Sequence, residues 1–189
     1  MTLTRLCPED YVTTRWSGGT TTELLIRPRG AVYGRRDFSC RVSSATVDLD
    51  SSTFTALPDY DRLIATLEGT VTLTHDGSAP FILSPYQVHA FDGGSKTISF
   101  GRCRDFNLML RKGRATGSLR ALEVTGSTDC TLSPTAKTAL LYCAEGACTA
   151  AGVRLAAGES LLLEDVATDT LHLIGRPQAR LMLAEVSCP

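Results

Sequence analysis

Two arginines of this chain lie inside apolar, strand-like segments, where a charged side chain needs a partner. Arg41 stands in the middle of "SCRVS", and Arg62 opens "RLIATLEG". Burying a guanidinium on an inward face is costly unless the group is paired and hydrogen-bonded. A carboxylate that accepts two parallel hydrogen bonds suits this planar group well. The two arginines therefore predict a site that holds a carboxylate.

Polar partners for these arginines come from other segments. Glu23 precedes an apolar run, and Asp105 and Asn107 share one face of "DFNLML" because alternate residues of a strand point the same way. In one interpretation the two acids neutralise the two arginines and fix the structure. In the other, which we favour for the cluster as a whole, one guanidinium stays free for a ligand carboxylate. Asn107 and Ser43 then supply neutral hydrogen bonds.

The single tryptophan heads the stretch "WSGGTTTEL", residues 16–24. Gly18 and Gly19 allow the backbone to bend sharply beside it. Trp16 can roof one end of a β-barrel, with its indole N–H bonded at the rim, or it can pack between two barrels. With this residue included, the predicted ligand-binding set is Trp16, Glu23, Arg41, Ser43, Arg62, His89, Asp105 and Asn107.

Metal-dependent chemistry is not predicted. A metal site in a small β-barrel needs clustered histidines, typically H-x-H with a glutamate and a distant histidine, because the ion binds converging imidazole and carboxylate groups. The chain has three histidines and no H-x-H. We expect His75, in the turn "THDG", to be exposed, His89 to lie near a barrel mouth, and His172 to face outward. No metal and no cofactor are expected.

Other catalytic motifs are absent from the sequence as well. It has neither the G-x-S-x-G elbow of a serine nucleophile nor a phosphate-binding G-x-x-x-x-G-K-[ST] loop. Arginines on both sides of Cys103 can lower the pKa of its thiol, although a buried or solvated thiol is the simpler interpretation. The alternative to a binding protein is a metal-independent enzyme, an isomerase or lyase. It would use Glu23 or Asp105 as the base and His89 as the acid. No catalytic residue is assigned.

Composition and charge exclude several classes of protein. The 189 residues are 43% hydrophobic and 21% charged, as in a globular protein with a core. A net charge of −1 provides no basic field for nucleic acid, and no apolar stretch approaches the length of a membrane span. The N-terminal "MTLTRLCPEDY" lacks the apolar core of a signal peptide, and the seven cysteines include no C-x-x-C pair. We expect a cytoplasmic protein without nucleic-acid or membrane partners; a homodimer remains open.

Short strand signals separated by Gly, Pro, Asp and Ser run through the whole chain, and the first 113 residues show no convincing helical periodicity. The second half repeats the pattern of the first: "TLEGTVTL" matches "CAEGACTA", and "FNLML" matches "ARLML" in the same order. We therefore predict an all-β fold of two cupin-like (double-stranded β-helix) barrels in one chain. The barrels span residues 1–113 and 114–189, packed as one bicupin unit.

Several segments together resemble the HutD/Ves family of bicupin-like proteins, over a region from about Tyr11 to the C-terminus. They are "WSGGTTTEL", "FSCRVSSATV", "FTALPDYDRLIATLEG", "HAFDGG" and "DFNLML". Two positions depart from the family pattern: Ser17 stands where Asn is usual, and Cys40 where Trp is usual. If Cys40 lines the cavity, its small thiol makes the pocket wider.

The resemblance implies a fold of two cupin-like barrels and no established enzymatic activity. One branch of the family is linked to histidine-utilisation gene clusters, with a proposed regulatory role and a proposed formylated acidic ligand. The other branch is stress-associated. We therefore expect a non-enzymatic protein that binds a small acidic metabolite, such as glutamate or a formylated glutamate derivative. Its role would be regulation or metabolite buffering.

Overall fold

The computed structural model describes residues 1–167 and 170–188 and divides into two compact units. The central unit is Val12–Thr116, and every residue of it is described. The terminal unit is Met1–Tyr11 together with the chain from Gly117 onward. The sequence placed residues 1–11 in the first domain. The structure places them in the terminal unit, where β1 (Thr2–Leu6) pairs along its whole length with β15 (Ser160–Glu164).

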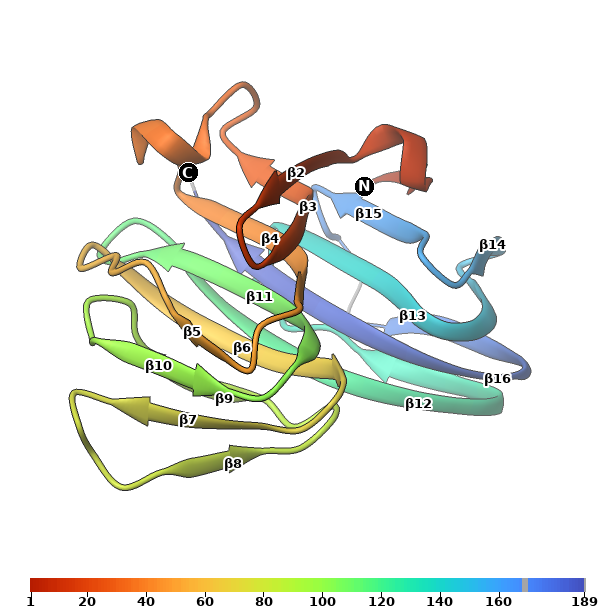
Figure 1. Cartoon of the computed structure of the whole chain (residues 1–189). Coiled ribbons are helices and arrows are strands. Elements are labelled where there is room, and N and C mark those ends of the chain that lie inside the picture. Colours follow the sequence, from red (N-terminus) through yellow and green to blue (C-terminus); the bar gives the residue numbers. More distant parts are fainter. Residues whose placement is uncertain (168–169, 189) are drawn as a thin grey trace. The chain divides into compact units, whose positions relative to one another are not determined.

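The central unit is built from short antiparallel strands and one 3₁₀ turn, η2 (Figure 1). The elements are β2 (Val12–Trp16), β3 (Gly19–Arg27), η2 (Tyr33–Arg35), β4 (Cys40–Val47), β5 (Ser51–Thr53), β6 (Tyr60–Glu68), β7 (Val71–His75), β8 (Phe81–Leu83), β9 (His89–Asp92), β10 (Thr97–Phe100) and β11 (Cys103–Arg111). They form a larger sheet with the order β2-β3-β4-β11-β6-β9 and a smaller sheet with the order β5-β10-β7-β8.

The terminal unit has one sheet as its framework within the described residues. Its order is β1-β15-β13-β16-β12, and β14 pairs with β13 outside this path. The elements other than β1 and β15 are η1 (Pro8–Asp10), β12 (Thr116–Thr131), β13 (Thr138–Ala150), β14 (Val153–Ala156) and β16 (Thr170–Ser187). The long strand β13 is built from the run of apolar residues that the sequence shows after residue 138, and its apolar side chains are buried.

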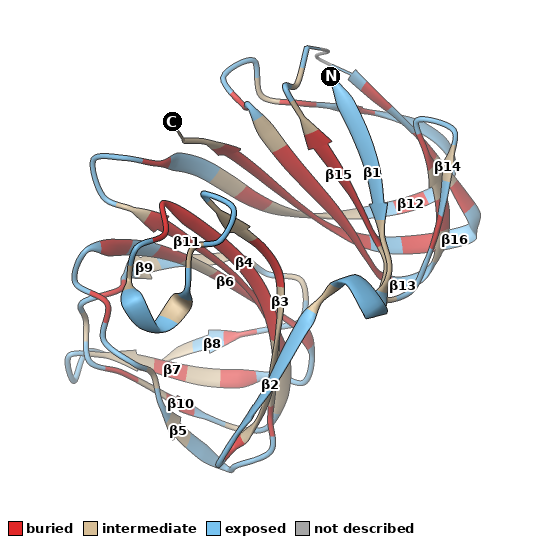
Figure 2. Cartoon of the chain, turned by 90° about the horizontal axis from the view of Figure 1, so that it is seen from above, coloured by how far each residue is buried: buried red, intermediate tan, exposed pale blue. Residues whose placement is uncertain are grey.

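The apolar cores follow from these strand patterns (Figure 2). In the central unit, Ile64, Val71, Leu73 and Leu83 form one buried cluster between the two sheets. A second cluster consists of Phe38, Leu57, Tyr60 and Met109. Through Phe38 it includes the segment that precedes β4. The terminal unit has one larger cluster of leucines, alanines and cysteines on its sheet. Burying such side chains supplies the main driving force for folding.

A Glu-Gly step recurs at corresponding places in the two units. Gly69 and Gly146 both have positive φ, of 80° and 72°. A Cβ on Gly69 would lie 2.4 Å from a backbone oxygen, and one on Gly146 would lie 2.2 Å from another, so neither position has room for a side chain. Each preceding glutamate forms an ion pair with an arginine of the neighbouring strand, Glu68 with Arg104 and Glu145 with Arg180. This shared device supports the repeat seen in the sequence.

The predicted all-β class is confirmed, since residues 1–167 and 170–188 contain strands and 3₁₀ turns but no α-helix. The arrangement as two closed barrels remains a prediction. Among the described residues, no helix is long and apolar enough to cross a membrane.

Candidate functional site

The predicted polar residues gather on the inner face of the larger sheet of the central unit. Alternation puts every second residue of each strand on this face, and the register sets the rows. Across β4, β11 and β6, the rows are Arg41–Met109–Arg62, Ser43–Asn107–Ile64 and Ala45–Asp105–Thr66. Segments far apart in the sequence thus present two arginines, an acid and an amide to one another.

A cavity of about 340 Å³ opens over this face. Its size suits a small organic molecule. It is lined by Thr14, Trp16, Thr21, Tyr33, Arg41, Ser43, Ala45, Val47, Ser52, Thr53, Phe54, Thr55, Arg62, Asp105, Asn107 and Met109. Six of the eight residues predicted to bind a ligand are therefore lining residues; Glu23 and His89 are not.

Arg41 is held by neighbouring protein groups. Its Nε donates to Glu23 Oε2 at 2.7 Å and its Nη1 donates to Ser43 Oγ at 3.1 Å. The Tyr33 ring covers the guanidinium at 4.5 Å. Glu23 thus neutralises Arg41 from β3, which matches the interpretation in which an acid fixes an arginine.

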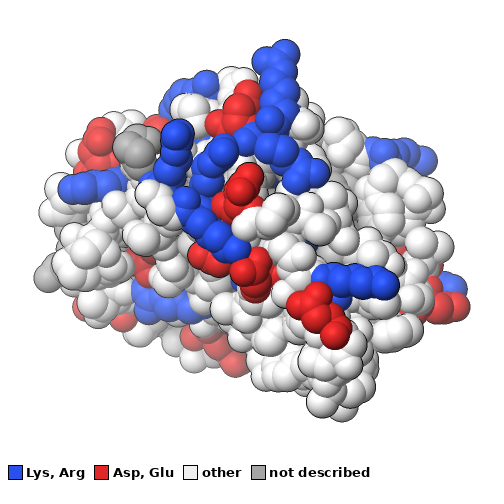
Figure 3. Space-filling model, turned by 90° about the vertical axis from the view of Figure 1, so that its left-hand side faces the viewer, with Lys and Arg blue, Asp and Glu red and all other residues white. Residues whose placement is uncertain are grey.

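Arg62 has no such partner within the described chain. It is 6% exposed, and its buried Nε has no hydrogen-bond partner. The guanidinium lies 4.9 Å from the Phe54 ring and 5.2 Å from the Phe91 ring, in cation–π contacts that compensate only part of the cost of burial. Burial lowers the pKa of Arg62, an effect that Asp105 opposes. The basic side chains on the surface differ from Arg62 in this respect, because on the face drawn in Figure 3 they lie among acidic side chains.

Asp105 and Asn107 complete the polar part of the pocket. Burial raises the pKa of Asp105 to about 7, and Arg62, the Ala45 backbone amide and Arg41 offset that rise only in part. Asn107 is 4% exposed, and its Oδ1 has no hydrogen-bond partner within the described residues. Buried polar atoms are usually satisfied, so an unsatisfied acceptor and an unsatisfied donor on residues that line one cavity mark a place where a ligand or water completes the network.

The "WSGG" stretch is the hairpin between β2 and β3, with Trp16 paired opposite Gly19. The Trp16 ring lies over Gly18, where a Cβ would come within 2.2 Å of the ring. Trp16 is 39% exposed and lines the pocket. In β3, the pairing register with β4 shifts between Glu23 and Leu25. The shift comes directly after the residue whose carboxylate is bonded to Arg41.

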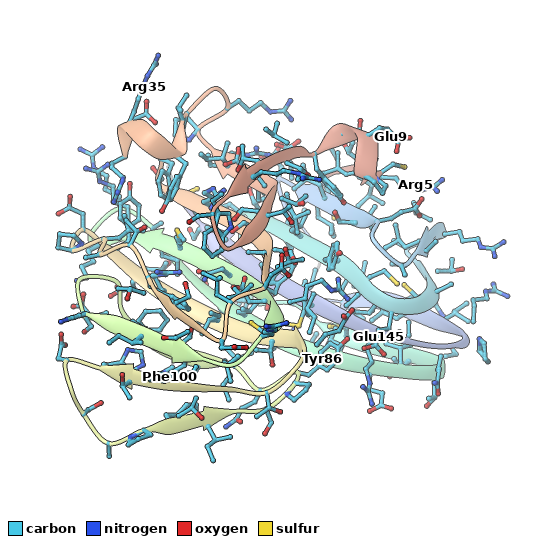
Figure 4. All side chains as sticks on the ribbon, viewed as in Figure 1. Arg5, Glu9, Arg35, Tyr86, Phe100 and Glu145 are labelled. Carbon is cyan, nitrogen blue, oxygen red and sulfur yellow. The ribbon has the colours of Figure 1, made fainter. Side chains whose placement is uncertain are left out.

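Sequence reasoning missed Tyr33 and Phe54 as lining residues. Tyr33 belongs to η2 and faces the pocket, whereas Arg35 of the same turn extends away from it (Figure 4). A stack of Tyr33, Phe38 and Tyr60 anchors the turn, with ring centroids 6.0 Å and 4.4 Å apart. The only sequence signal for Tyr33 was an isolated aromatic residue within an arginine-rich loop.

His75 and His89 form a pair outside the pocket. Their Nε2 atoms lie 2.9 Å apart and their ring centroids 5.1 Å apart, so the rings meet nearly head to head. His75 Nδ1 lies 2.9 Å from the Thr97 hydroxyl, which donates to the Ser95 carbonyl. His75 was expected to be exposed in a turn. It instead ends β7, and its bond to His89 of β9 links the two sheets of the central unit.

We expect this pair to make the protein sensitive to mild acid. Burial lowers the pKa of His75 and of His89, and for His89 the neighbouring His75 adds to the effect. The folded state therefore binds protons less readily than the unfolded chain, whose histidine pKa is about 6.5. The contribution of the histidine pair to stability is fully present above about pH 6.5 and decreases as the pH falls toward the lower folded-state pKa values. Asp105, whose pKa is raised to about 7, contributes the opposite trend, so the pair is measured by comparing variants with the wild type.

Urea unfolding at pH 7.5 and pH 5 measures this loss. His89→Gln keeps a neutral hydrogen-bond donor but cannot titrate, so its stability should decrease less than that of the wild type over this range. The exposed His172 provides the matched control, and His172→Gln should keep the wild-type decrease. Equal decreases for wild type and His89→Gln would show that the pair does not carry the effect.

The remaining candidates lie away from the pocket or are not activated. Cys40 is fully buried and is not a lining residue, so the substitution at this position does not widen the cavity. Burial, reinforced by Asp105, raises the pKa of Cys103 to about 12, and its thiol is not activated by the adjacent arginines. His172 is exposed, as predicted, beside Asp129. The described residues contain no group of three or more His, Cys, Asp or Glu side chains suited to a metal ion.

Comparisons with known proteins agree with this fold. The family model described as HutD matches residues 8–182. A conserved protein of unknown function from Pseudomonas aeruginosa PAO1 is 31% identical, with a TM-score of 0.82 over 99% of this chain and 100% of its own. HutD from Pseudomonas fluorescens SBW25, solved in a formate condition, is 28% identical, with a TM-score of 0.81 over 100% of both chains. No curated protein matches in sequence.

A more distant structure shows the fold alone. The nickel(II) complex of a bacterial pirin from Escherichia coli is 9% identical, with a TM-score of 0.73 over 97% of this chain and 98% of its own. A cupin 2 conserved barrel domain protein from Leptotrichia buccalis is 10% identical, with a TM-score of 0.57 over 97% of this chain and 96% of its own, so the shared fold is of the cupin type.

Proposed function

We propose that this chain, which belongs to the HutD family, binds a small organic acid in the pocket of its central unit, with the Arg62 guanidinium on the ligand carboxylate. The observation that carries the proposal is the state of Arg62, which is buried and lines the cavity while its Nε lacks a partner. A buried charge is costly without an opposite charge and hydrogen bonds. A ligand carboxylate supplies both.

The rest of the pocket supports a small ligand with polar atoms besides its carboxylate. Ser43 and Asn107 offer neutral hydrogen-bonding groups beside Arg62, and Phe54 and Trp16 offer aromatic surface. Glutamate and formylated glutamate derivatives have this chemistry and fit the scale of the cavity. Formate, present in the condition of the Pseudomonas fluorescens HutD structure, is the smallest carboxylate probe.

The role that follows is binding without catalysis, for regulation or metabolite buffering, in histidine utilisation or a stress response. We place it in the cytoplasm, where its seven cysteines, all free of disulfides, would stay reduced. The geometry does not favour the enzymatic alternative, because Glu23 is engaged by Arg41 and His89 is not a lining residue. General acid–base catalysis needs both groups within reach of one substrate.

Thermal melting in the presence of carboxylates tests the proposal. Sodium formate, L-glutamate and N-formyl-L-glutamate are each titrated, and formamide serves as the control that lacks a carboxylate. A ligand that binds only the folded state raises the melting temperature in proportion to ln(1 + [L]/Kd). We expect at least one acid to raise it and formamide not to. Arg102→Met, on a side chain that is 67% exposed, should keep the response. A flat response to all three acids would refute carboxylate binding.

A further inference from the structure

We propose that the pocket takes up one proton at Asp105 when it binds a carboxylate, so that the neutral Asp105 carboxyl donates a hydrogen bond to the ligand while Arg62 neutralises its charge. This inference rests on the proposed function and adds a regulation by pH to it. The proton comes from solvent and adds to the Asp105 carboxylate, and no other bond is made or broken.

Charge balance on the pocket wall is the first reason. Arg41 and Glu23 form a neutral ion pair at 2.7 Å. Arg62 and Asp105 remain, and they sum to zero when Asp105 is ionised and to +1 when Asp105 is neutral. An anionic ligand therefore meets a compensating positive charge only if Asp105 carries a proton. Two carboxylates close to one guanidinium cannot both stay ionised at low cost, as in carboxylate pairs that share one proton.

The position of Asp105 is the second reason. It is 6% exposed, lines the cavity and lies in the row beside Ala45 and Thr66 on the same face as Asn107. Within the described residues it has no ion-pair partner at contact distance; Arg62 acts on it only across a longer distance. A ligand held by Arg62 thus comes next to a carboxyl group with hydrogen-bonding capacity to spare.

The other charged and titratable groups around Asp105 are not expected to take up the proton in its place. Arg62 on β6 and Arg41 on β4 carry guanidinium groups, which donate hydrogen bonds and do not accept them. Glu23 on β3 is bonded to Arg41. Cys103, two residues along β11, stays a thiol because its pKa is raised to about 12. Tyr33 of η2 covers Arg41 and acts electrostatically on Arg62.

The pH range in which binding takes up a proton follows from the pKa of Asp105 in the absence of ligand. The pKa of Asp105 is raised to about 7 by burial before any ligand enters. Below that pH the proton is already present, and binding needs no uptake. Above it, each ligand bound requires one proton, so Kd is expected to rise about tenfold per pH unit, the slope for linkage to one proton.

Formate is the probe that tests this linkage, because it remains ionised throughout the range used. Its Kd for the wild type is measured from melting shifts at pH 6, 7, 8 and 9. We expect Kd to change little between pH 6 and pH 7 and to rise by nearly tenfold between pH 8 and pH 9. Asp105→Asn keeps a neutral donor in place and should abolish the slope, so the variant binds formate more tightly than the wild type does at pH 9. Asp50→Asn, on a side chain that is 88% exposed, should keep the slope.

The outcomes separate this inference from the proposed function. A wild type that binds formate equally at pH 6 and pH 9 overturns proton uptake and leaves carboxylate binding standing. A slope that persists in Asp105→Asn assigns the proton to another group and also overturns the inference. A wild type that binds none of formate, L-glutamate and N-formyl-L-glutamate at any of these pH values overturns both. If Asp105→Asn does not fold, Asp105→Ser, which also offers a neutral hydrogen-bond donor and does not titrate in this range, takes its place, and a slope that persists in this variant overturns the inference in the same way.

Discussion

The Arg62→Met variant is expected to lose the response to carboxylates and, without ligand, to be more stable than the wild type. Methionine fills much of the same space beside Phe54 and Phe91 without a charge. Replacing buried charges by apolar side chains of similar volume is often neutral or stabilising, here by about 1–2 kcal/mol. Removing a charged partner of a ligand carboxylate should weaken binding by at least about 30-fold.

Arg41→Met is the matched comparison on the neighbouring strand. It leaves Glu23, whose side chain is 22% exposed, without its ion-pair partner. Losing one member of a partly buried pair is destabilising, so this variant should unfold more readily than the wild type. Urea unfolding without ligand and formate titration of both variants measure the two effects. If Arg62→Met proves less stable than the wild type, Arg62 has a structural role and our assignment of it to the ligand is wrong.

Phe38→Ala is expected to destabilise the protein by about 3–5 kcal/mol, the usual cost of removing a buried aromatic ring. Phe38 is fully buried and stacks against Tyr60 at 4.4 Å and Tyr33 at 6.0 Å. The Tyr60 hydroxyl also donates to the Phe38 carbonyl at 2.9 Å, which ties the segment before β4 to the sheet. Because Tyr33 covers Arg41, loosening this stack should also weaken carboxylate binding.

Urea unfolding measures the stability of this variant, and a formate titration below its melting temperature measures binding. The control is Phe100→Ala, on a ring that is 46% exposed, which should change stability by less than about 1 kcal/mol. A Phe38→Ala variant as stable as Phe100→Ala would show that the stack does not anchor the η2 turn.

On the proposal that the pocket binds a carboxylate, its polar residues reduce the stability of the protein in favour of binding. Arg41 is bonded to Glu23, whereas the buried Arg62 Nε and Asn107 Oδ1 have no hydrogen-bond partner within the described residues. Asp105 has no ion-pair partner at contact distance in the same part of the chain. Such sites are commonly less stable than an optimised core would be. Because these groups already line the pocket, we expect little free energy to be lost to reorganisation when a carboxylate binds.

Local pattern was enough to predict the all-β class and the residues that share a face. Alternation along one strand depends only on the extended backbone, so "SCRVS" determined that Arg41 and Ser43 lie together, and "DFNLML" did the same for Asp105 and Asn107. The Glu-Gly step that precedes a turn was readable in both halves, because positive φ favours glycine wherever it occurs.

The tertiary structure alone decided which of these faces meet and which charges are paired. Arg41 and Arg62 look equivalent in the sequence, but only the strand order places Glu23 beside Arg41 and leaves Arg62 against two phenylalanine rings. The pairing of His75 with His89, and of the first strand with β15, likewise joins distant segments. These contacts depend on strand register and on which strands are adjacent. Both are set by the packing of the whole unit, so they cannot be predicted from the residues next to each position in the sequence.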